Sequence, residues 1–489
     1  MIEDSLHSSK QSTNHTIMRY QSTRGGVQDV EFKDVLLSGY ANDGGMFLPM
    51  STPTVSSATL QKWSALSFED LAYEVTSLYI EEKDIPSTDL KDIYHKAFST
   101  FKVPDVVPIK KLSDRLTIAE LFHGRSLAFK DLAMSCLGQF YNYFLTKSQE
   151  HLTLVVCTSG DTGSSAIESV RGLHLVDIIV ILPRGRCTLI QERQMTTVLD
   201  NNVHVFRADG SSDDIDLIVR KLFADSEFVR MQHLASSSSL NFVRILIQMV
   251  HFFYIYLKMC PSADEEVEMV LPTGGGGNIT AGIIAKQMGL PVKLVCAVNH
   301  NNILSRIMKS GHCLLGDVQV TIAPAMDIQF AYNLERVWYL ISGGSSETVK
   351  TIMADVDRNI VNVPSDIIAL MNSLIKVYVV SNDEEVKDTI RRCWNDNDYF
   401  ICPHTAIGVS YIYAELNSSS NKQKSVVLAT ASPLKFPDAI KASGLSPPTS
   451  EAIEDLLTAP TKYTDLDLGL DWTSIVRRKI EEITLSRKI

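Results

Sequence analysis

Short apolar blocks and longer mixed segments alternate along most of the chain. The apolar blocks have the length of buried strands, whereas the mixed segments between them have the spacing of amphipathic helices. The strands are predicted at residues 116–120, 152–156, 176–182, 203–207, 267–271, 294–298, 377–380 and 426–429. This repeated succession of strand and helix predicts an α/β fold in which doubly wound sheets form two lobes.

The ends of the chain do not follow this alternation. Residues 1–17 contain no apolar block and predict a disordered extension, and residues 18–103 predict a separate N-terminal domain with one clear helix at 68–82. Residues 104–489 then form the main region, with a smaller lobe around 150–230 inside it. A chain of 489 residues exceeds one compact core, so several domains are expected.

A run of four glycines stands between a predicted strand and a predicted helix. The segment TGGGGN contains Gly274, Gly275, Gly276, Gly277 and Asn278. Backbone N–H groups that converge at a helix start bind anions, so the segment predicts a phosphate-binding loop. It has neither the Gly-Lys-Ser/Thr of a P-loop nor GxGxxG spacing. A flexible hinge is the alternative interpretation.

One lysine stands out in the segment ELFHGRSLAFKD, residues 120–131. Ser126 is a candidate N-cap for a helix that runs through Phe144, which places Lys130 in the first turn among apolar neighbours. Desolvation and the positive helix end both favour the neutral amine, which can form a Schiff base with an aldehyde. The alternative is a lysine that extends to solvent. A reactive lysine together with a phosphate-binding loop suggests pyridoxal phosphate.

The segment CTSGDTG, residues 157–163, also joins a predicted strand to a predicted helix. Its hydroxyl and amide groups can hold a carboxylate or phosphate of a substrate. The alternative is that Asp161 or Thr162 only caps the helix. The candidate substrate-binding residues are Ser159, Gly160, Asp161, Thr162 and Gly163.

Seven motifs together resemble the threonine synthase family, in the family's order and from about residue 19 to 437. They are RYQSTRG (19–25), LLSGYANDGGMFLP (36–49), ELFHGRSLAFKD, CTSGDTGSSA, LPTGGGGN, CPHTAIGV (402–409) and ATASPLKFPDA (429–439). The resemblance implies a fold-type II enzyme, similar to the tryptophan synthase β-subunit, with pyridoxal 5'-phosphate attached to Lys130. It implies further that residues 274–278 bind the cofactor phosphate and that a hydroxyl meets the pyridine nitrogen. Thr430 is the matching position, with Ser432 as the alternative.

Three positions depart from the pattern of authentic synthases. Cys402 replaces the acid of DPHTA, Ser432 replaces the histidine of ATAHPAKF, and Ser238 stands where SLNSINWAR has an asparagine. With IQERQMTT at 190–197, these changes resemble the threonine synthase-like 2 branch of animals, which is associated with phospho-lyase chemistry.

That resemblance implies elimination of phosphate from O-phosphohomoserine or O-phosphothreonine to give 2-oxobutyrate, ammonia and phosphate. One alternative is a threonine synthase that makes threonine from O-phosphohomoserine. The other is a cofactor-binding interaction protein without turnover. The residues that hold the substrate phosphate are not fixed by a motif, and each candidate can equally be solvent-exposed: Arg184, Arg186, Lys110, Lys111 and Arg125.

The composition of the chain limits the classes of partner and the compartment that are expected. A formal charge of −11 argues against a nucleic-acid surface. The eight cysteines form no CxxC pair, which favours free thiols in the cytoplasm over disulfides or a metal site. The longest apolar stretch, 245–257, is interrupted by Gln248 and His251 and is too short to span a membrane, and His251 is expected in the core. Oligomeric state stays open.

Overall fold

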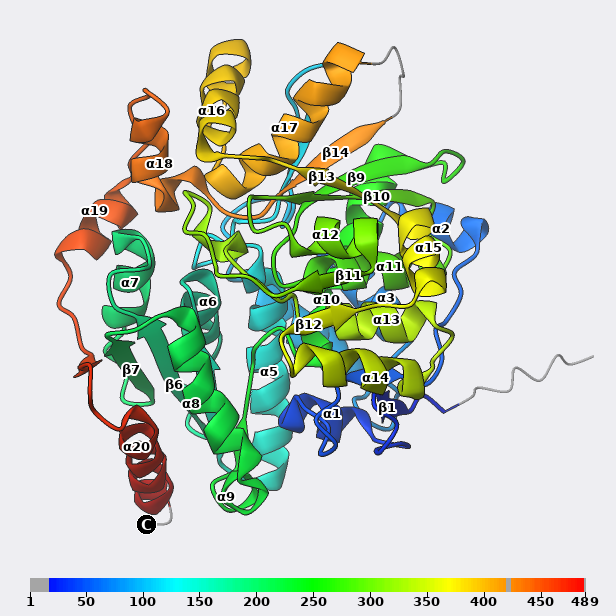
Figure 1. Ribbon diagram of the computed structural model, residues 1–489. Coiled ribbons are helices and arrows are strands. Elements are labelled where there is room, and N and C mark those ends of the chain that lie inside the picture. Colours follow the sequence, from blue (N-terminus) through cyan, green and yellow to red (C-terminus); the bar gives the residue numbers. More distant parts are fainter. Residues whose placement is uncertain (1–16, 419–423, 488–489) are drawn as a thin grey trace, which may run out of the picture.

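The computed structural model describes residues 17–418 and 424–487. Two mainly parallel sheets lie side by side with helices on their faces, and helix α5 runs between them (Figure 1). The predicted doubly wound α/β class is therefore confirmed. Apart from Ile17, the predicted N-terminal extension lies outside the described residues.

The larger sheet has six strands, and all but the edge strand β3 run parallel. Their order is β13 (Ile375–Val379), β10 (Val292–Val298), β9 (Val267–Pro272), β14 (Ser425–Ala429), β4 (Thr117–Glu120) and β3 (Ile109–Lys111). The predicted strand at 116–120 and the four between 267 and 429 fall within a few residues of these bounds.

The smaller sheet is wholly parallel and extends beyond the predicted lobe. Its order is β15 (Thr464–Leu466), β7 (Val203–Ala208), β6 (Val176–Pro183), β5 (Leu152–Cys157) and β8 (Leu234–Ala235). The predicted lobe around 150–230 supplies β5, β6 and β7, whereas β8 follows it and the C-terminal segment supplies β15.

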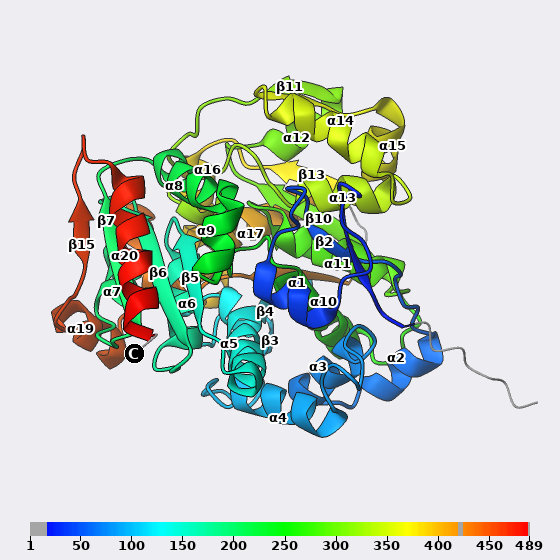
Figure 2. The ribbon, with the colours of Figure 1, turned by 90° about the horizontal axis from the view of Figure 1, so that it is seen from below.

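The C-terminal segment completes this lobe. Helix α20 (Trp472–Arg487) lies along the face of β6 and β7, as Figure 2 shows. Its Val476, Ile480 and Ile483 pack into the cluster formed with α8 (Ser212–Ala224). Such contacts join segments far apart in sequence, which is why the lobe cannot be delimited from the local pattern.

The main core surrounds two long helices, α5 (Lys130–Ser148) and α10 (Phe242–Met259). Within the described ranges, α10 is the helix with the length and mean hydropathy of a membrane span, but 89% of its apolar window is buried inside the protein. It is longer than the predicted stretch at 245–257 because Asn241 caps it, accepting a hydrogen bond from the Val243 N–H at 3.0 Å.

The N-terminal region packs against α10 and α5 through its own helices. The helix predicted at 68–82 ends sooner, as α3 (Phe68–Thr76), and the chain turns there because the Thr76 carbonyl accepts from the N–H of Tyr79 and of Ile80. The other elements of this region are β1 (Tyr20–Ser22), α1 (Phe32–Ser38), β2 (Phe47–Pro49), α2 (Ser57–Trp63) and α4 (Ser87–Phe98).

The remaining elements surround the two sheets. Those of the smaller lobe are α6 (Asp161–Val170), α7 (Leu189–Thr196), α9 (Ser226–Met231) and α19 (Glu451–Thr458). Those around the larger sheet are α11 (Gly277–Gln287), α12 (Ile303–Ser310), β11 (His312–Leu314), η1 (Pro324–Met326), α13 (Leu334–Ile341), α14 (Ser346–Val356), β12 (Ile360–Asn362), α15 (Ser365–Leu374), α16 (Asp383–Asn397), α17 (Pro403–Ser418), η2 (Pro433–Lys435) and α18 (Pro437–Ala442).

Candidate active site

The carboxyl ends of β9 and β14 meet the amino ends of α5, α6 and α11 at a cavity of about 160 Å³. This edge of a parallel sheet is where α/β folds bind ligands. Many of the predicted site residues line it: Lys130, Ser159, Asp161, Thr162, Gly274, Gly275, Gly276, Gly277, Asn278 and Thr430. The structure thus brings together motifs separated by up to 300 residues.

Lys130 lies in the first turn of α5, as predicted, but the helix begins at Lys130 itself and Ser126 does not cap it. Ser126 instead donates from Oγ to Asp131 Oδ1 at 2.6 Å, and the N-cap position belongs to Phe129. The Phe129 N–H donates to the Thr430 carbonyl at 2.8 Å. This backbone contact holds Lys130 and Thr430 at the same cavity.

A buried charge cluster surrounds the lysine amine. Lys130 Nζ lies 3.5 Å from Asp161 Oδ2, and the fully buried Lys435 Nζ lies 2.7 Å from Asp161 Oδ1. Burial lowers the pKa of Lys130, and the Asp161 carboxylate offsets only part of that effect. For Asp161, the two lysines outweigh burial and hold the pKa of the carboxyl far below its usual range.

The CTSGDTG segment contributes side chains rather than a ring of free amides. The N–H groups of Gly160 and Gly163 both donate to Thr158 Oγ1 at 3.0 Å, and neither glycine lines the cavity. Gly160, not Asp161 or Thr162, occupies the N-cap position of α6. Ser159 and Thr162 do line the cavity, so they remain candidates for substrate binding.

The glycine loop is shaped to receive an anion. Gly276 has φ +78°, a left-handed conformation that favours glycine, and it is the N-cap of α11. A Cβ atom at Gly275 would lie 3.9 Å from its nearest neighbour, Ile328 Cδ1, so the loop is open there. Within the described residues, the N–H groups of Gly274, Gly275 and Gly276 donate to no protein acceptor.

Helix α10 adds a polar face that the sequence interpretation missed. Arg244 and Gln248, one turn apart, both line the cavity and are nearly fully buried. Arg244 Nε, Gln248 Oε1 and Asn278 Nδ2 are buried without a protein partner. Buried polar groups are usually hydrogen-bonded, so three such atoms around one cavity fit a bound polar ligand, as pyridoxal phosphate is.

His404 is the histidine among the described residues that line the cavity, and its ring is hydrogen-bonded to the backbone. Its Nε2 accepts a hydrogen bond from the Ala325 N–H at 3.1 Å. Burial lowers the pKa of His404 to about 4, so the ring is neutral at physiological pH. His404 therefore supports the segment that covers the cavity rather than presenting a charged group.

The three altered positions perform local structural roles beside the cavity. Cys402 Sγ accepts from the Thr405 N–H at 3.4 Å, the contact of a helix cap at the start of α17. Ser432 Oγ accepts from the Leu434 N–H at 3.3 Å, so its hydroxyl caps η2, whereas Thr430 lines the cavity. Ser238 Oγ accepts from the Leu240 N–H at 3.4 Å.

The basic residues proposed for a substrate phosphate do not reach the cavity. Arg184 pairs with Asp209, Lys111 with Asp114 and Arg125 with Glu168, while Arg186 and Lys110 also lie outside the cavity lining. Two buried cations lie there instead: Arg244 lines the cavity, and Lys435 pairs with Asp161. They belong to the segments ATASPLKFPDA and SSSLNFVR, where a cation within an apolar stretch was the available signal.

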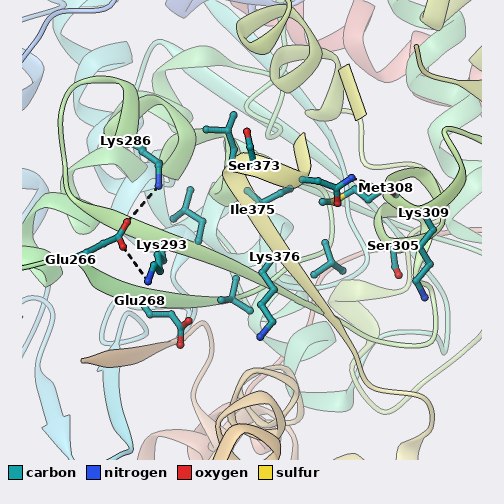
Figure 3. A pocket seen from close by; sticks show the side chains of 15 residues that line it. Glu266, Glu268, Lys286, Lys293, Ser305, Met308, Lys309, Ser373, Ile375 and Lys376 are labelled. Carbon is teal, nitrogen blue, oxygen red and sulfur yellow. Dashed lines mark hydrogen bonds and ion pairs between the residues drawn. The ribbon is translucent and has the colours of Figure 1, made fainter. Parts of the chain in front are cut away.

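A larger hollow of about 550 Å³ lies at the opposite, amino end of β9, β10 and β13 (Figure 3). There Glu266 lies between Lys293, at 3.2 Å, and Lys286, at 3.8 Å. It contains neither Lys130 nor the glycine loop, so the candidate chemistry belongs to the smaller cavity.

Family models match nearly the whole chain. They are threonine synthase N terminus over residues 19–98, pyridoxal-phosphate dependent enzyme over 105–431, and threonine synthase, C-terminal, over 405–476. Threonine synthase-like 2 of Xenopus laevis is 45% identical, covering 96% of this chain and 100% of that protein. The Homo sapiens protein of that name is 44% identical, covering 96% and 98%.

Two solved structures are similar to this chain over nearly its whole length. The PLP-bound threonine synthase from Brucella melitensis has a TM-score of 0.88 at 34% identity, covering 96% of this chain and 100% of that chain. The threonine synthase from yeast has a TM-score of 0.88 at 36% identity, covering 96% and 99%. The fold and cavity thus define a fold-type II enzyme whose cofactor is pyridoxal 5'-phosphate. Within that class, the chain belongs to the threonine synthase family.

Proposed function

We propose that this protein is a phospho-lyase that acts on small phosphorylated amino acids, O-phosphohomoserine or O-phosphothreonine. The charge balance of the cavity carries the proposal. Among the described residues that line the cavity, the buried Arg244 and the largely buried Lys130 accompany one carboxylate, Asp161, which also pairs with the buried Lys435. A surplus of buried positive charge favours ligands with several anionic groups. The cofactor phosphate accounts for one such group and a substrate phosphate for another.

The residues at the cavity have separate tasks in this proposal. Lys130 would attach the cofactor, the loop from Gly274 to Asn278 would bind its phosphate, and the Thr430 hydroxyl would hold the pyridine nitrogen. When bound, pyridoxal phosphate supplies an electron sink for negative charge on the substrate α-carbon. Freed when the substrate amine takes its place on the cofactor, the Lys130 amine would remove the α-proton as general base, with its pKa lowered by burial. For O-phosphohomoserine, whose phosphate is on the γ-carbon, a β-proton must also be removed before phosphate leaves, and a proton returns to the γ-carbon. Ser159 and Thr162 offer hydroxyls to the substrate.

Arg244 is our candidate for the substrate's anionic group. Burial lowers its pKa to about 10, so the guanidinium stays protonated at neutral pH. In the described part of the chain it forms no ion pair, and its Nε has no partner. A buried guanidinium with an unused N–H suits a phosphate or carboxylate oxygen.

Loss of phosphate without threonine formation is supported by the engagement of the acid and the imidazole in the described cavity lining, Asp161 and His404. To make threonine, an enzyme must add water at the β-carbon and deliver protons for that step. Asp161 is held between two lysines, and His404 uses Nε2 to accept from Ala325. At the altered positions, Cys402 and Ser432 supply neither an acid nor an imidazole. The released enamine then takes up one water to give 2-oxobutyrate and ammonia, beside the phosphate already eliminated.

The proposal places the enzyme in the cytoplasm. All eight cysteines are free, five of them buried, which agrees with a reducing compartment.

The test is phosphate and keto-acid release from both substrates by the purified holoenzyme. Lys130→Ala should abolish both products and the visible absorbance of the attached cofactor. Lys147→Ala is the matched control, because Lys147 lies on the same helix but is 58% exposed, and it should leave turnover unchanged. Cofactor binding without phosphate release from either substrate would overturn the proposal and favour a protein without turnover.

A further inference from the structure

Helix α10 continues its polar face one turn beyond the cavity with His251. The ring is fully buried, as expected for a core histidine, but it is not inert. Its Nε2 lies 2.9 Å from Asn278 Oδ1. Because a carboxamide oxygen only accepts hydrogen bonds, Nε2 must carry the hydrogen and donate it to Asn278. The bond joins the middle of α10 to the first turn of α11.

The same contact decides which end of the Asn278 amide is available. With Oδ1 facing His251, the Nδ2 group is left as a donor, and it is buried without a protein partner. Asn278 lines the cavity at the end of the glycine loop. The unused N–H bonds of this side chain therefore belong to the part of the site where we place the cofactor.

We propose that His251 is a positioning residue that fixes the Asn278 amide with its NH₂ group as a donor to an oxygen of bound pyridoxal phosphate. A histidine with its hydrogen on Nδ1 would instead accept at Nε2 and turn the amide oxygen toward an anionic ligand. The proposal rests on the placement of the cofactor at residues 274–278, and not on which phosphorylated substrate is used.

The surroundings of the ring maintain this arrangement. Burial lowers the pKa of His251 to about 4, so the ring stays neutral, with Nε2 as the donor and Nδ1, which is buried without a protein partner, as the acceptor. The adjacent Phe252 ring stacks on it with centroids 4.8 Å apart. A neutral ring fixed by its neighbours can set the orientation of Asn278.

The test measures pyridoxal phosphate affinity by titrating the apo form of the full chain. His251→Leu should weaken binding about tenfold, as expected for one net hydrogen bond of roughly 1.4 kcal/mol. His251→Gln keeps an N–H donor and should restore most of the affinity. Met249→Leu, a fully buried position on the same helix, is the control for general repacking and should bind as the wild type does.

A double-mutant cycle separates positioning from an independent effect. Because His251 acts through Asn278, the His251→Leu/Asn278→Ala protein should bind no more weakly than Asn278→Ala alone. Additive losses would overturn the proposal. Unchanged affinity in His251→Leu with a loss in Asn278→Ala would also overturn it, while leaving the cofactor placement intact. Unchanged affinity in both single variants would also contradict the placement of the cofactor at residues 274–278.

A measurement on the wild type covers the case in which His251→Leu does not fold. In protein labelled with ¹⁵N at asparagine, the Asn278 side-chain NH₂ signal, assigned by its loss in Asn278→Ala, should shift when pyridoxal phosphate is added. In His251→Gln the shift should be retained. A signal in the wild type that does not respond to the cofactor would contradict the proposal.

Discussion

Lys435 and Asp161 form a fully buried ion pair, with Nζ 2.7 Å from Oδ1, although 274 positions separate them in the chain. The other carboxylate oxygen faces Lys130 at 3.5 Å. Gln191 donates from Nε2 to Asp161 Oδ1 at 2.9 Å. One carboxylate thus ties the cofactor lysine to α6, α7 and the segment after β14, and it offsets part of the cost of burying two amines.

Removing that carboxylate should be among the most costly single changes in the protein. Asp161→Asn leaves the buried Lys435 and the largely buried Lys130 without their ion-pair partner, and breaking a buried pair in this way costs about 3–5 kcal/mol. Urea-induced unfolding should report the loss. Asp209→Asn is the comparison, since that exposed acid pairs with Arg184 at the surface and should change stability by less than about 0.5 kcal/mol. Equal effects of the two substitutions would contradict the cluster's role.

Two buried histidines should make the fold sensitive to mild acid. Burial lowers the pKa of His251 and of His404 to about 4, from 6.5 in the unfolded chain. The contribution of these two neutral rings to the free energy of unfolding is therefore complete above pH 6.5 and is lost as pH falls toward 4. At pH 5, each histidine should have lowered the free energy of unfolding by about 2 kcal/mol through proton linkage.

The measurement is the free energy of unfolding at pH 7 and at pH 5, in the wild type and in His404→Gln. The variant removes one of the two titrating groups, so its stability should fall by about 2 kcal/mol less over that interval. The same pH dependence in both proteins would show that His404 is not a neutral buried group.

The C-terminal helix should be required for the smaller lobe. Ile480 on α20 is fully buried against α8, so Ile480→Ala should cost about 2–5 kcal/mol. Leu485 lies on the same helix but is 64% exposed, and Leu485→Ala should have little effect on thermal stability. A small, equal effect of both changes would mean that α20 is not part of the lobe's core.

The altered segments at Cys402 and Ser432 should influence which product forms. They lie together, since Cys402 packs against Ala431 and Phe436, and the Phe436 ring contacts His404. The double variant Cys402→Asp/Ser432→His restores the acid and the imidazole of the synthase motifs. It should shift the product ratio from 2-oxobutyrate toward threonine, measured by chromatography. An unchanged ratio in a folded, active variant would exclude these two positions as the cause.

The sequence predicts the parts of the site that depend on local order along the chain. Lys130 at a helix start and the glycines after β9 follow from the succession of strand, turn and helix, and parallel strands bring such turns to one edge. The partners of Lys130 do not follow in this way. Lys435 and Arg244 reach the site by packing of distant segments, and a buried lysine has the same local pattern as an exposed one. The N-cap prediction at Ser126 is wrong for a similar reason, since its hydroxyl bonds Asp131 and Ser165.

The most direct test of the central claim is the ratio of products to released phosphate. Purified holoenzyme with O-phosphohomoserine, and separately with O-phosphothreonine, should give 2-oxobutyrate and ammonia in equal amounts to phosphate from at least one of them, with little threonine. Threonine as the main product from O-phosphohomoserine would contradict the phospho-lyase account and identify a threonine synthase.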